Sequence, residues 1–180
     1  MQGLLERYPG HELAFLNVAQ GMVFERPTMA HTVLGSCVAV TFYAPRRGLS
    51  GLFHALLPKA CDYRLHSPEL SPYKFVDTAI ATIVHRFNLR GVHTQEIECK
   101  VFGGSTALFA EEMSVGRRNV ETAFATLAEL GLRVAASNVG GARGRKIVFA
   151  SGTGEIFVRL LNNGNEGRPG EKVRRRVVLP

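Results

Sequence analysis

Cys37 is the residue whose setting in this sequence best suits nucleophilic chemistry. It follows two small residues, Gly35 and Ser36, and stands where the apolar run 37–44 begins. Glycine lets the backbone turn tightly and lets a substrate approach closely. A cysteine at the start of a strand would be anchored on one side and exposed on the other, so its thiol is a candidate nucleophile.

A β-hairpin is expected to position this cysteine. Residues 37–44 and 49–57 are rich in β-branched and aromatic side chains, which are typical of strands. The segment 45–48, Pro-Arg-Arg-Gly, supplies turn residues between them, and Pro58 ends the second run.

The register of this hairpin predicts a partner for the thiol. If Ala44 faces Leu49, then Ala39 faces His54, and residues two apart on a strand share a face. Cys37 and His54 would then be diagonal neighbours, about 7–8 Å apart at Cα, within reach of an imidazole. A slip of one residue would put them on opposite faces.

Together these residues predict acyl-transfer chemistry. A free thiol is only slightly ionised at neutral pH, and an adjacent imidazole can take its proton and pass it to a leaving amine. The hydroxyl of Thr32 is a candidate third group, and backbone N–H groups near Cys37, or those of Gly103 and Gly104, are candidate oxyanion donors. The expected substrate-contacting positions are Gly35, Ser36, Gly103 and Gly104.

Structural interpretations of the same residues remain open. A cysteine in a valine-rich strand and a histidine between Phe53 and Ala55 are also typical of a hydrophobic core. Cys99 is expected in the core and Cys61 in a loop. No histidines or cysteines have the close spacing of a structural zinc site, so no metal is predicted.

Length and composition bound the class of protein. The chain has 180 residues, of which 46% are hydrophobic and 21% charged, which suits one globular domain. Its three cysteines cannot all pair, which favours a reducing compartment. No apolar run could span a membrane and the first residues do not resemble a signal peptide. We therefore predict a cytoplasmic protein without membrane insertion.

The remaining pattern predicts an α+β fold, with two helices packed on a largely antiparallel mixed sheet. Helical spacing of apolar residues marks 73–87 and 119–130, and a second hairpin is expected around the turn 151–154. The other expected strands are 14–25, 96–102, 132–136, 146–151 and 155–161.

The net charge of +7 is concentrated partly in the C-terminal segment. We expect a domain over 1–161 and a flexible basic tail over 162–180. A tail that binds polyanions is the competing interpretation. Because the basic cluster has no aromatic residues for stacking, no nucleic-acid partner is predicted.

Five further segments stand in order within residues 14–161. They are Leu34-Gly35-Ser36-Cys37-Val38-Ala39-Val40, Gly51-Leu52-Phe53-His54-Ala55-Leu56-Leu57-Pro58, Lys100-Val101-Phe102-Gly103-Gly104, Gly116-Arg117-Arg118-Asn119-Val120, and Gly140-Gly141-Ala142-Arg143-Gly144-Arg145-Lys146 with Thr153-Gly154. Together, in this order, they resemble the CheD family of chemoreceptor glutamine deamidases.

This resemblance implies a sandwich fold similar to that of deamidating bacterial toxins. It implies hydrolysis of glutamine side-chain amides on the cytoplasmic domains of chemotaxis receptors, without a cofactor. The family's nucleophile, histidine and threonine fall on Cys37, His54 and Thr32. A CheC-type phosphatase is a possible partner, and a non-catalytic adaptor that binds such a phosphatase is the alternative function.

Overall fold

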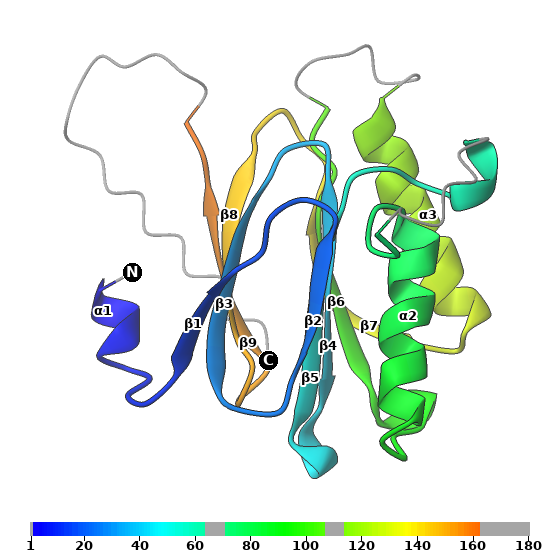
Figure 1. Cartoon of the computed structure of the whole chain (residues 1–180). Coiled ribbons are helices and arrows are strands. Elements are labelled where there is room, and N and C mark those ends of the chain that lie inside the picture. Colours follow the sequence, from blue (N-terminus) through cyan, green and yellow to red (C-terminus); the bar gives the residue numbers. More distant parts are fainter. Residues whose placement is uncertain (1, 64–70, 107–113, 163–180) are drawn as a thin grey trace.

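The computed structural model describes residues 2–63, 71–106 and 114–162 (Figure 1). The helices in these ranges are α1 (Gln2–Leu5), α2 (Val76–Asn88) and α3 (Val115–Glu129). The strands are β1 (Glu12–Phe15), β2 (Gln20–Phe24), β3 (Thr28–Leu34), β4 (Val38–Ala44), β5 (Leu49–Ala55), β6 (Glu98–Gly103), β7 (Arg133–Val139), β8 (Arg145–Ala150) and β9 (Glu155–Leu160). Short 3₁₀ turns cover Pro45–Arg47, Ala60–Asp62 and Thr94–Glu96.

Two sheets stack face to face, and α2 and α3 cover the outer face of one of them (Figure 1). The covered sheet has five strands in the order β2-β5-β4-β6-β7, and the other has four in the order β1-β3-β8-β9. Only the pairs β1–β3 and β6–β7 are parallel among the described strands. The predicted α+β class is confirmed, and the fold is a sandwich of two sheets with helices on one side.

The apolar spacing of α2 explains its place on the sheet. Its buried residues recur every three or four positions, so one stripe faces the five-stranded sheet. Those residues are Val76, Ala79, Ile80, Ile83, Val84 and Phe87. They pack with one face of β4, β5 and β6, while the opposite faces of these strands pack against the four-stranded sheet.

The hairpin of β4 and β5 has the predicted register. Ala44 pairs with Leu49 and Ala39 pairs with His54. Pro45 starts the 3₁₀ turn between them, and Gly48 closes it with a left-handed backbone, φ 59°. An even separation along each strand therefore places positions 37, 39 and 54 on one face, the face between the two sheets.

The N-terminal strands differ from the prediction. The single strand expected over 14–25 is wrong, because β1 and β2 lie in different sheets. The chain reverses between them at Ala19, whose φ of 60° is uncommon for a residue with a side chain. β3, which was not predicted, runs antiparallel to β8, and these two strands form the centre of the four-stranded sheet.

The other expected elements are present with shifted ends. The helix expected from 119 begins earlier, at Val115, and the strand expected over 132–136 extends to Val139. The hairpin of β8 and β9 forms as predicted, with Gly154 donating to the carbonyl of Ala150 in its turn. The predicted tail falls on residues 163–180, outside the described ranges, apart from Asn162.

Candidate active site

A side-chain hydrogen bond between Thr32 and His54 connects the two sheets. Thr32 lies on β3 and His54 on β5, and both side chains are buried between the sheets. Thr32 Oγ1 lies 2.8 Å from Nδ1 of His54 and 2.7 Å from the carbonyl oxygen of Leu16. The hydroxyl is therefore fixed between a ring nitrogen and a backbone acceptor.

This arrangement sets the tautomer of His54. The Leu16 carbonyl can only accept, so the single proton of the Thr32 hydroxyl is donated to it. The hydroxyl oxygen must then accept from Nδ1–H of His54, which leaves the lone pair on Nε2. Nε2 is buried and has no hydrogen-bond partner among the described residues. Burial lowers the pKa of His54, so the ring is neutral at neutral pH and can act as a base.

Cys37 lies immediately before β4, on the same face of the sheet as His54. Its side chain is partly exposed and packs against the core between the sheets. Burial raises the pKa of the Cys37 thiol, and a hydrogen bond from the residue's own backbone N–H opposes this in part. The thiol is therefore protonated at neutral pH and needs a base to become a nucleophile.

The loop that carries Cys37 is fixed through its carbonyl groups. The carbonyl of Gly35 accepts from the backbone N–H of Ser105 at 2.9 Å, and that of Cys37 accepts from Gly104 at 2.8 Å. The carbonyl of Ser36 accepts from Nδ2 of Asn119 at 3.0 Å. All three carbonyls of the loop are thus held by groups outside it.

The amide groups of the same loop are less fully paired. Within the ranges that the structure describes, the backbone N–H of Ser36 donates to no carbonyl or side chain, and that of Cys37 donates only to the residue's own thiol. Two such donors beside a thiol are the arrangement that stabilises an oxyanion during acyl transfer.

Gly103, the last residue of β6, and Gly104, which follows it, support the cysteine loop. Both have positive φ, 109° and 66°, which favours glycine. A Cβ on Gly103 would overlap the carbonyl of Cys37, and one on Gly104 would overlap Val120 of α3. Because the Gly104 N–H is donated to Cys37, we assign it to fixing the loop rather than to binding an oxyanion. Gly35 and Ser36 are exposed at the tip of the loop.

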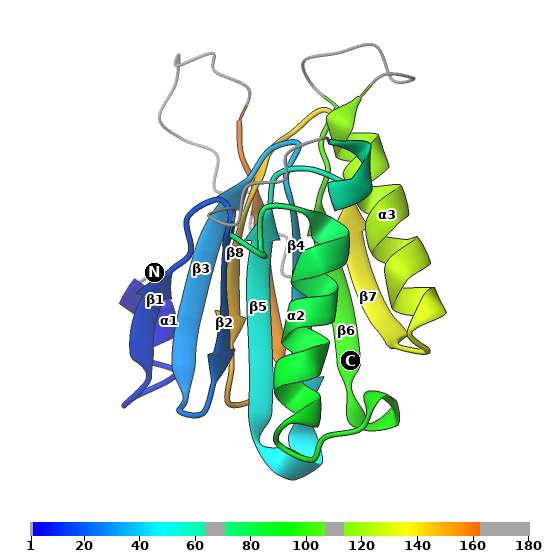
Figure 2. The ribbon, with the colours of Figure 1, turned by 45° about the vertical axis from the view of Figure 1, so that its right-hand side comes forward.

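Asn119 is a residue of the site that the sequence reasoning did not select. It is fully buried on α3, and its Nδ2 contacts the carbonyls of both Ser36 and Leu56. Figure 2 shows that the start of α3 lies at the same end of the molecule as the connection from β3 to β4. The sequence signal for Asn119 is the segment 116–120, which carries part of the family resemblance without indicating a role for the asparagine.

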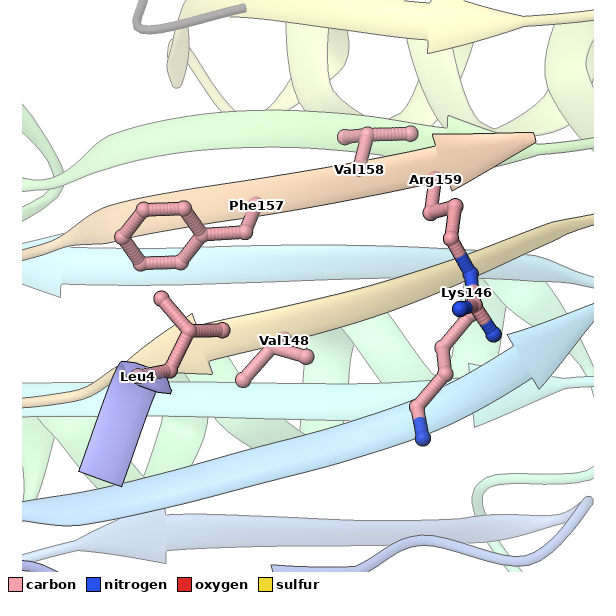
Figure 3. A pocket seen from close by; sticks show the side chains of 6 residues that line it. All are labelled: Leu4, Lys146, Val148, Phe157, Val158 and Arg159. Carbon is pink, nitrogen blue, oxygen red and sulfur yellow. The ribbon is translucent and has the colours of Figure 1, made fainter. Parts of the chain in front are cut away.

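Other chemically notable groups lie outside this site. Cys99 is buried, as expected, and burial raises its pKa far above the ordinary value, while Cys61 is exposed on the turn Ala60–Asp62. A pocket lies on the outer face of the four-stranded sheet, next to α1 (Figure 3). Its lining is apolar and basic, without a thiol or an imidazole. It is lined by Leu4, Lys146, Val148, Phe157, Val158 and Arg159. No group of three metal-binding side chains gathers within the described residues.

Within the described ranges, no helix is both long and apolar enough to span a bilayer.

Comparisons of the sequence with known proteins agree with each other on the family. Residues 56–160 match the family model described as CheD chemotactic sensory transduction. A protein of Oleidesulfovibrio alaskensis, "Probable chemoreceptor glutamine deamidase CheD", is 43% identical over 82% of this chain and 72% of its own length. A protein of the same name from Nitratidesulfovibrio vulgaris is 41% identical over 81% of this chain and 76% of its own.

The fold itself also occurs in a solved structure. The crystal structure of Bacillus licheniformis hypothetical protein YfiH superposes with a TM-score of 0.50 at 12% identity, covering 78% of this chain and 68% of that one. At this identity the likeness concerns the fold alone. The family model, which begins just after His54, and the longer matches to the relatives show that this chain belongs to the CheD family.

Proposed function

We propose that the protein hydrolyses glutamine side-chain amides of chemoreceptors to glutamate and ammonia, with Cys37, His54 and Thr32 as its catalytic groups. The hydrogen bond between Thr32 Oγ1 and His54 Nδ1 carries this proposal. It leaves the other ring nitrogen available as a base on the face of the sheet that also holds Cys37. The family relatives bear the name chemoreceptor glutamine deamidase.

Acylation would begin from a neutral thiol and a neutral imidazole. As the Cys37 sulfur attacks the glutamine side-chain carbonyl, Nε2 of His54 takes the thiol proton. The oxyanion that forms is stabilised by the backbone N–H groups of Ser36 and Cys37. The C–N bond then breaks, the imidazolium gives its proton to the departing nitrogen, and ammonia leaves behind a thioester.

Deacylation uses the same groups in reverse order. Neutral His54 takes a proton from water, and the resulting hydroxide attacks the thioester carbonyl. The C–S bond breaks, glutamate is released, and the sulfur recovers its proton from the imidazolium. The Cys37 thiol makes no hydrogen bond to another side chain within the described residues, so we expect proton transfer to require rotation of the thiol toward Nε2 of His54.

The third member of this set is a hydroxyl rather than a carboxylate. Thr32 orients the ring and fixes its tautomer, but adds no negative charge that would raise the pKa of His54. A base with a lowered pKa suits a reaction that starts from neutral partners, because the ring stays unprotonated at neutral pH.

The test is mass spectrometry of receptor cytoplasmic fragments after incubation with the protein. Each deamidated glutamine gains about one mass unit, because NH₂ is replaced by OH in acyl hydrolysis. We expect the shift with wild type and its loss in Cys37→Ala and in His54→Ala. Cys61→Ser, which changes an exposed thiol on the turn Ala60–Asp62, serves as the control and should retain the activity. Deamidation that persists in Cys37→Ala would rule out the proposed nucleophile.

We infer that the protein acts in the cytoplasm, because its proposed substrates are the cytoplasmic domains of receptors. A CheC-type phosphatase stays a possible partner, predicted from the family resemblance. The adaptor alternative is tested by the same variant, since binding without catalysis would leave receptor signalling unchanged in Cys37→Ala.

A further inference from the structure

The strands of the catalytic hairpin separate next to the nucleophile. Pairing of β4 with β5 ends at Val38 and Ala55. Beyond that point the backbone N–H groups of Leu56 and Leu57 turn to the carbonyl of Lys74, at 3.0 and 3.1 Å. The carbonyl of Cys37 turns the other way, to Gly104 on the β6 side. The sheet's own hydrogen bonds therefore do not fix the distance between the cysteine loop and the end of β5.

Asn119 connects the cysteine loop to the end of β5, which the hydrogen bonds of the sheet do not do. Its Nδ2 lies 3.0 Å from the carbonyl oxygen of Ser36 and 2.9 Å from that of Leu56. The NH₂ group has two protons, so each carbonyl receives one. Ser36 precedes Cys37 directly, and Leu56 follows His54 by two residues, so a single side chain joins the segments that carry the thiol and the imidazole.

The environment makes this link specific to a carboxamide. Asn119 is fully buried, and its Oδ1 has no hydrogen-bond partner among the described residues. The opposite orientation of the amide would set its oxygen against two carbonyl oxygens, so the Nδ2 contacts determine the orientation. Aspartate at this position would create the same repulsion with an added charge.

The helix that carries Asn119 is itself fixed against the cysteine loop. A Cβ on Gly116 of α3 would lie 2.5 Å from the carbonyl oxygen of Ser105, so the helix backbone directly touches the segment that follows β6. Ser105 and Gly104 are the residues whose N–H groups hold Gly35 and Cys37. The first turns of α3 thus hold the loop through the backbone that follows β6 and through the side chain of Asn119.

We propose that Asn119 is a positioning residue, which sets the approach of the Cys37 thiol to the His54 imidazole by bridging Ser36 and Leu56. The inference rests on the proposed function of these two side chains, and it assigns Asn119 no contact with substrate. Losing the bridge would leave two carbonyls without their donor and let the two segments move apart. Misplacement by about 1 Å can cost on the order of 10²-fold in rate.

The test follows the reactivity of Cys37 itself and so needs no receptor. In a Cys61→Ser background, iodoacetamide alkylation of Cys37 is measured against pH, since the remaining cysteine, Cys99, is fully buried. Wild type and His54→Ala define the profiles with and without the imidazole. We expect Asn119→Ala and Asn119→Asp to follow the His54→Ala profile, and Asn119→Ser, which keeps one donor, to fall between the two.

A second measurement separates positioning from stability. Deamidation kinetics and urea unfolding are recorded for the same variants and for Thr122→Ala, a control that changes another buried polar residue of α3. We expect kcat to fall about 10²-fold in Asn119→Ala with KM changed by less than about twofold. Thr122→Ala should keep the wild-type alkylation profile.

The outcomes distinguish the two proposals. If folded Asn119→Ala and Asn119→Ser lose stability but keep the wild-type alkylation profile, Asn119 is only structural and the inference is overturned. If receptor glutamines are converted equally well by Cys37→Ala, the proposed function fails, while the alkylation profiles still decide whether Asn119 positions the thiol.

Discussion

Thr32 Oγ1 and His54 Nδ1 lie 2.8 Å apart although the two residues belong to different sheets. The candidate catalytic machinery is therefore assembled across the layers of the sandwich. His54 and Cys37 come from one hairpin, whereas the group that orients His54 arrives on β3. Packing of the two sheets against each other is what gives the imidazole its orientation.

Replacing Thr32 by valine should reduce kcat by about 10²-fold with little change in KM. Valine keeps the shape but removes the hydroxyl that donates to the Leu16 carbonyl and accepts from Nδ1–H. The ring is then free to adopt the other tautomer or to rotate. Thr32→Ser keeps the hydroxyl and should stay within a few-fold of wild type. Ammonia release from receptor fragments measures both.

Thr41→Val provides the matched control for that change, because Thr41 is buried on β4 outside the candidate site. It should lower stability without a comparable loss of kcat. If Thr32→Val works at the wild-type rate, the hydroxyl has no part in orienting His54.

The pH profile of kcat/KM should have its acidic limb below the ordinary pKa of histidine, about 6.5. Burial lowers the pKa of His54, and only the neutral ring can accept the thiol proton. Activity should therefore fall as pH decreases through this lowered pKa and stay level across neutral pH. Since burial raises the pKa of Cys37, thiolate forms only at alkaline pH and cannot account for the neutral plateau.

The measurement is a series of initial rates of ammonia release between about pH 4.5 and 9, a range that spans the ordinary histidine pKa. A rate that increases only with thiolate formation at alkaline pH would contradict the role of His54 as base.

The lowered pKa of His54 also predicts that the stability of the fold depends on pH. The unfolded chain binds the proton more readily, so stability is retained above the ordinary pKa and declines as pH falls toward the lowered one. His54→Gln should remove that decline.

The hairpin could be predicted from sequence because its information is local. The turn residues at 45–48 fix the loop length, and the loop length fixes the pairing of Ala39 with His54. The helix α2 was likewise readable, since its apolar spacing follows from the face it buries. In each case neighbouring residues in the sequence contain the signal.

The second sheet could not be predicted in the same way. β3 has apolar residues on both faces, with Met29 and Val33 on one and Ala30 and Leu34 on the other, so polar alternation does not mark it. It pairs with β8, more than a hundred residues away. The contact of Thr32 with His54 depends on that pairing, and residue spacing alone did not indicate it.

Asn119 shows the same limit at the level of one side chain. It contacts Ser36, 83 positions away in the chain, and its function depends on a helix packing beside the end of a hairpin. An asparagine near the start of a helix is common in sequences. Only the three-dimensional arrangement distinguishes this one.

Gly103→Ala should both destabilise the fold and reduce kcat. The backbone φ of 109° disfavours a side chain, and the added Cβ would overlap the carbonyl of Cys37. We expect a loss of about 3 kcal/mol in the free energy of unfolding, because strain and overlap each cost about 1–3 kcal/mol. Since the overlap displaces the residue that holds the nucleophile, kcat should fall in the folded fraction as well.

Gly131→Ala separates overlap from backbone strain in this test. Gly131 also has positive φ, 67°, but no atom lies within 4 Å of the position its Cβ would take. Gly131→Ala should lower the free energy of unfolding by only about 1–2 kcal/mol. It should leave kcat unchanged, because the strain arises just beyond the C-terminal end of α3, far from the start of the helix that contacts the cysteine loop. Urea unfolding and ammonia release give the two quantities for each variant. Equal effects of the two substitutions on kcat would mean that contact between Gly103 and the Cys37 carbonyl does not set the position of the thiol.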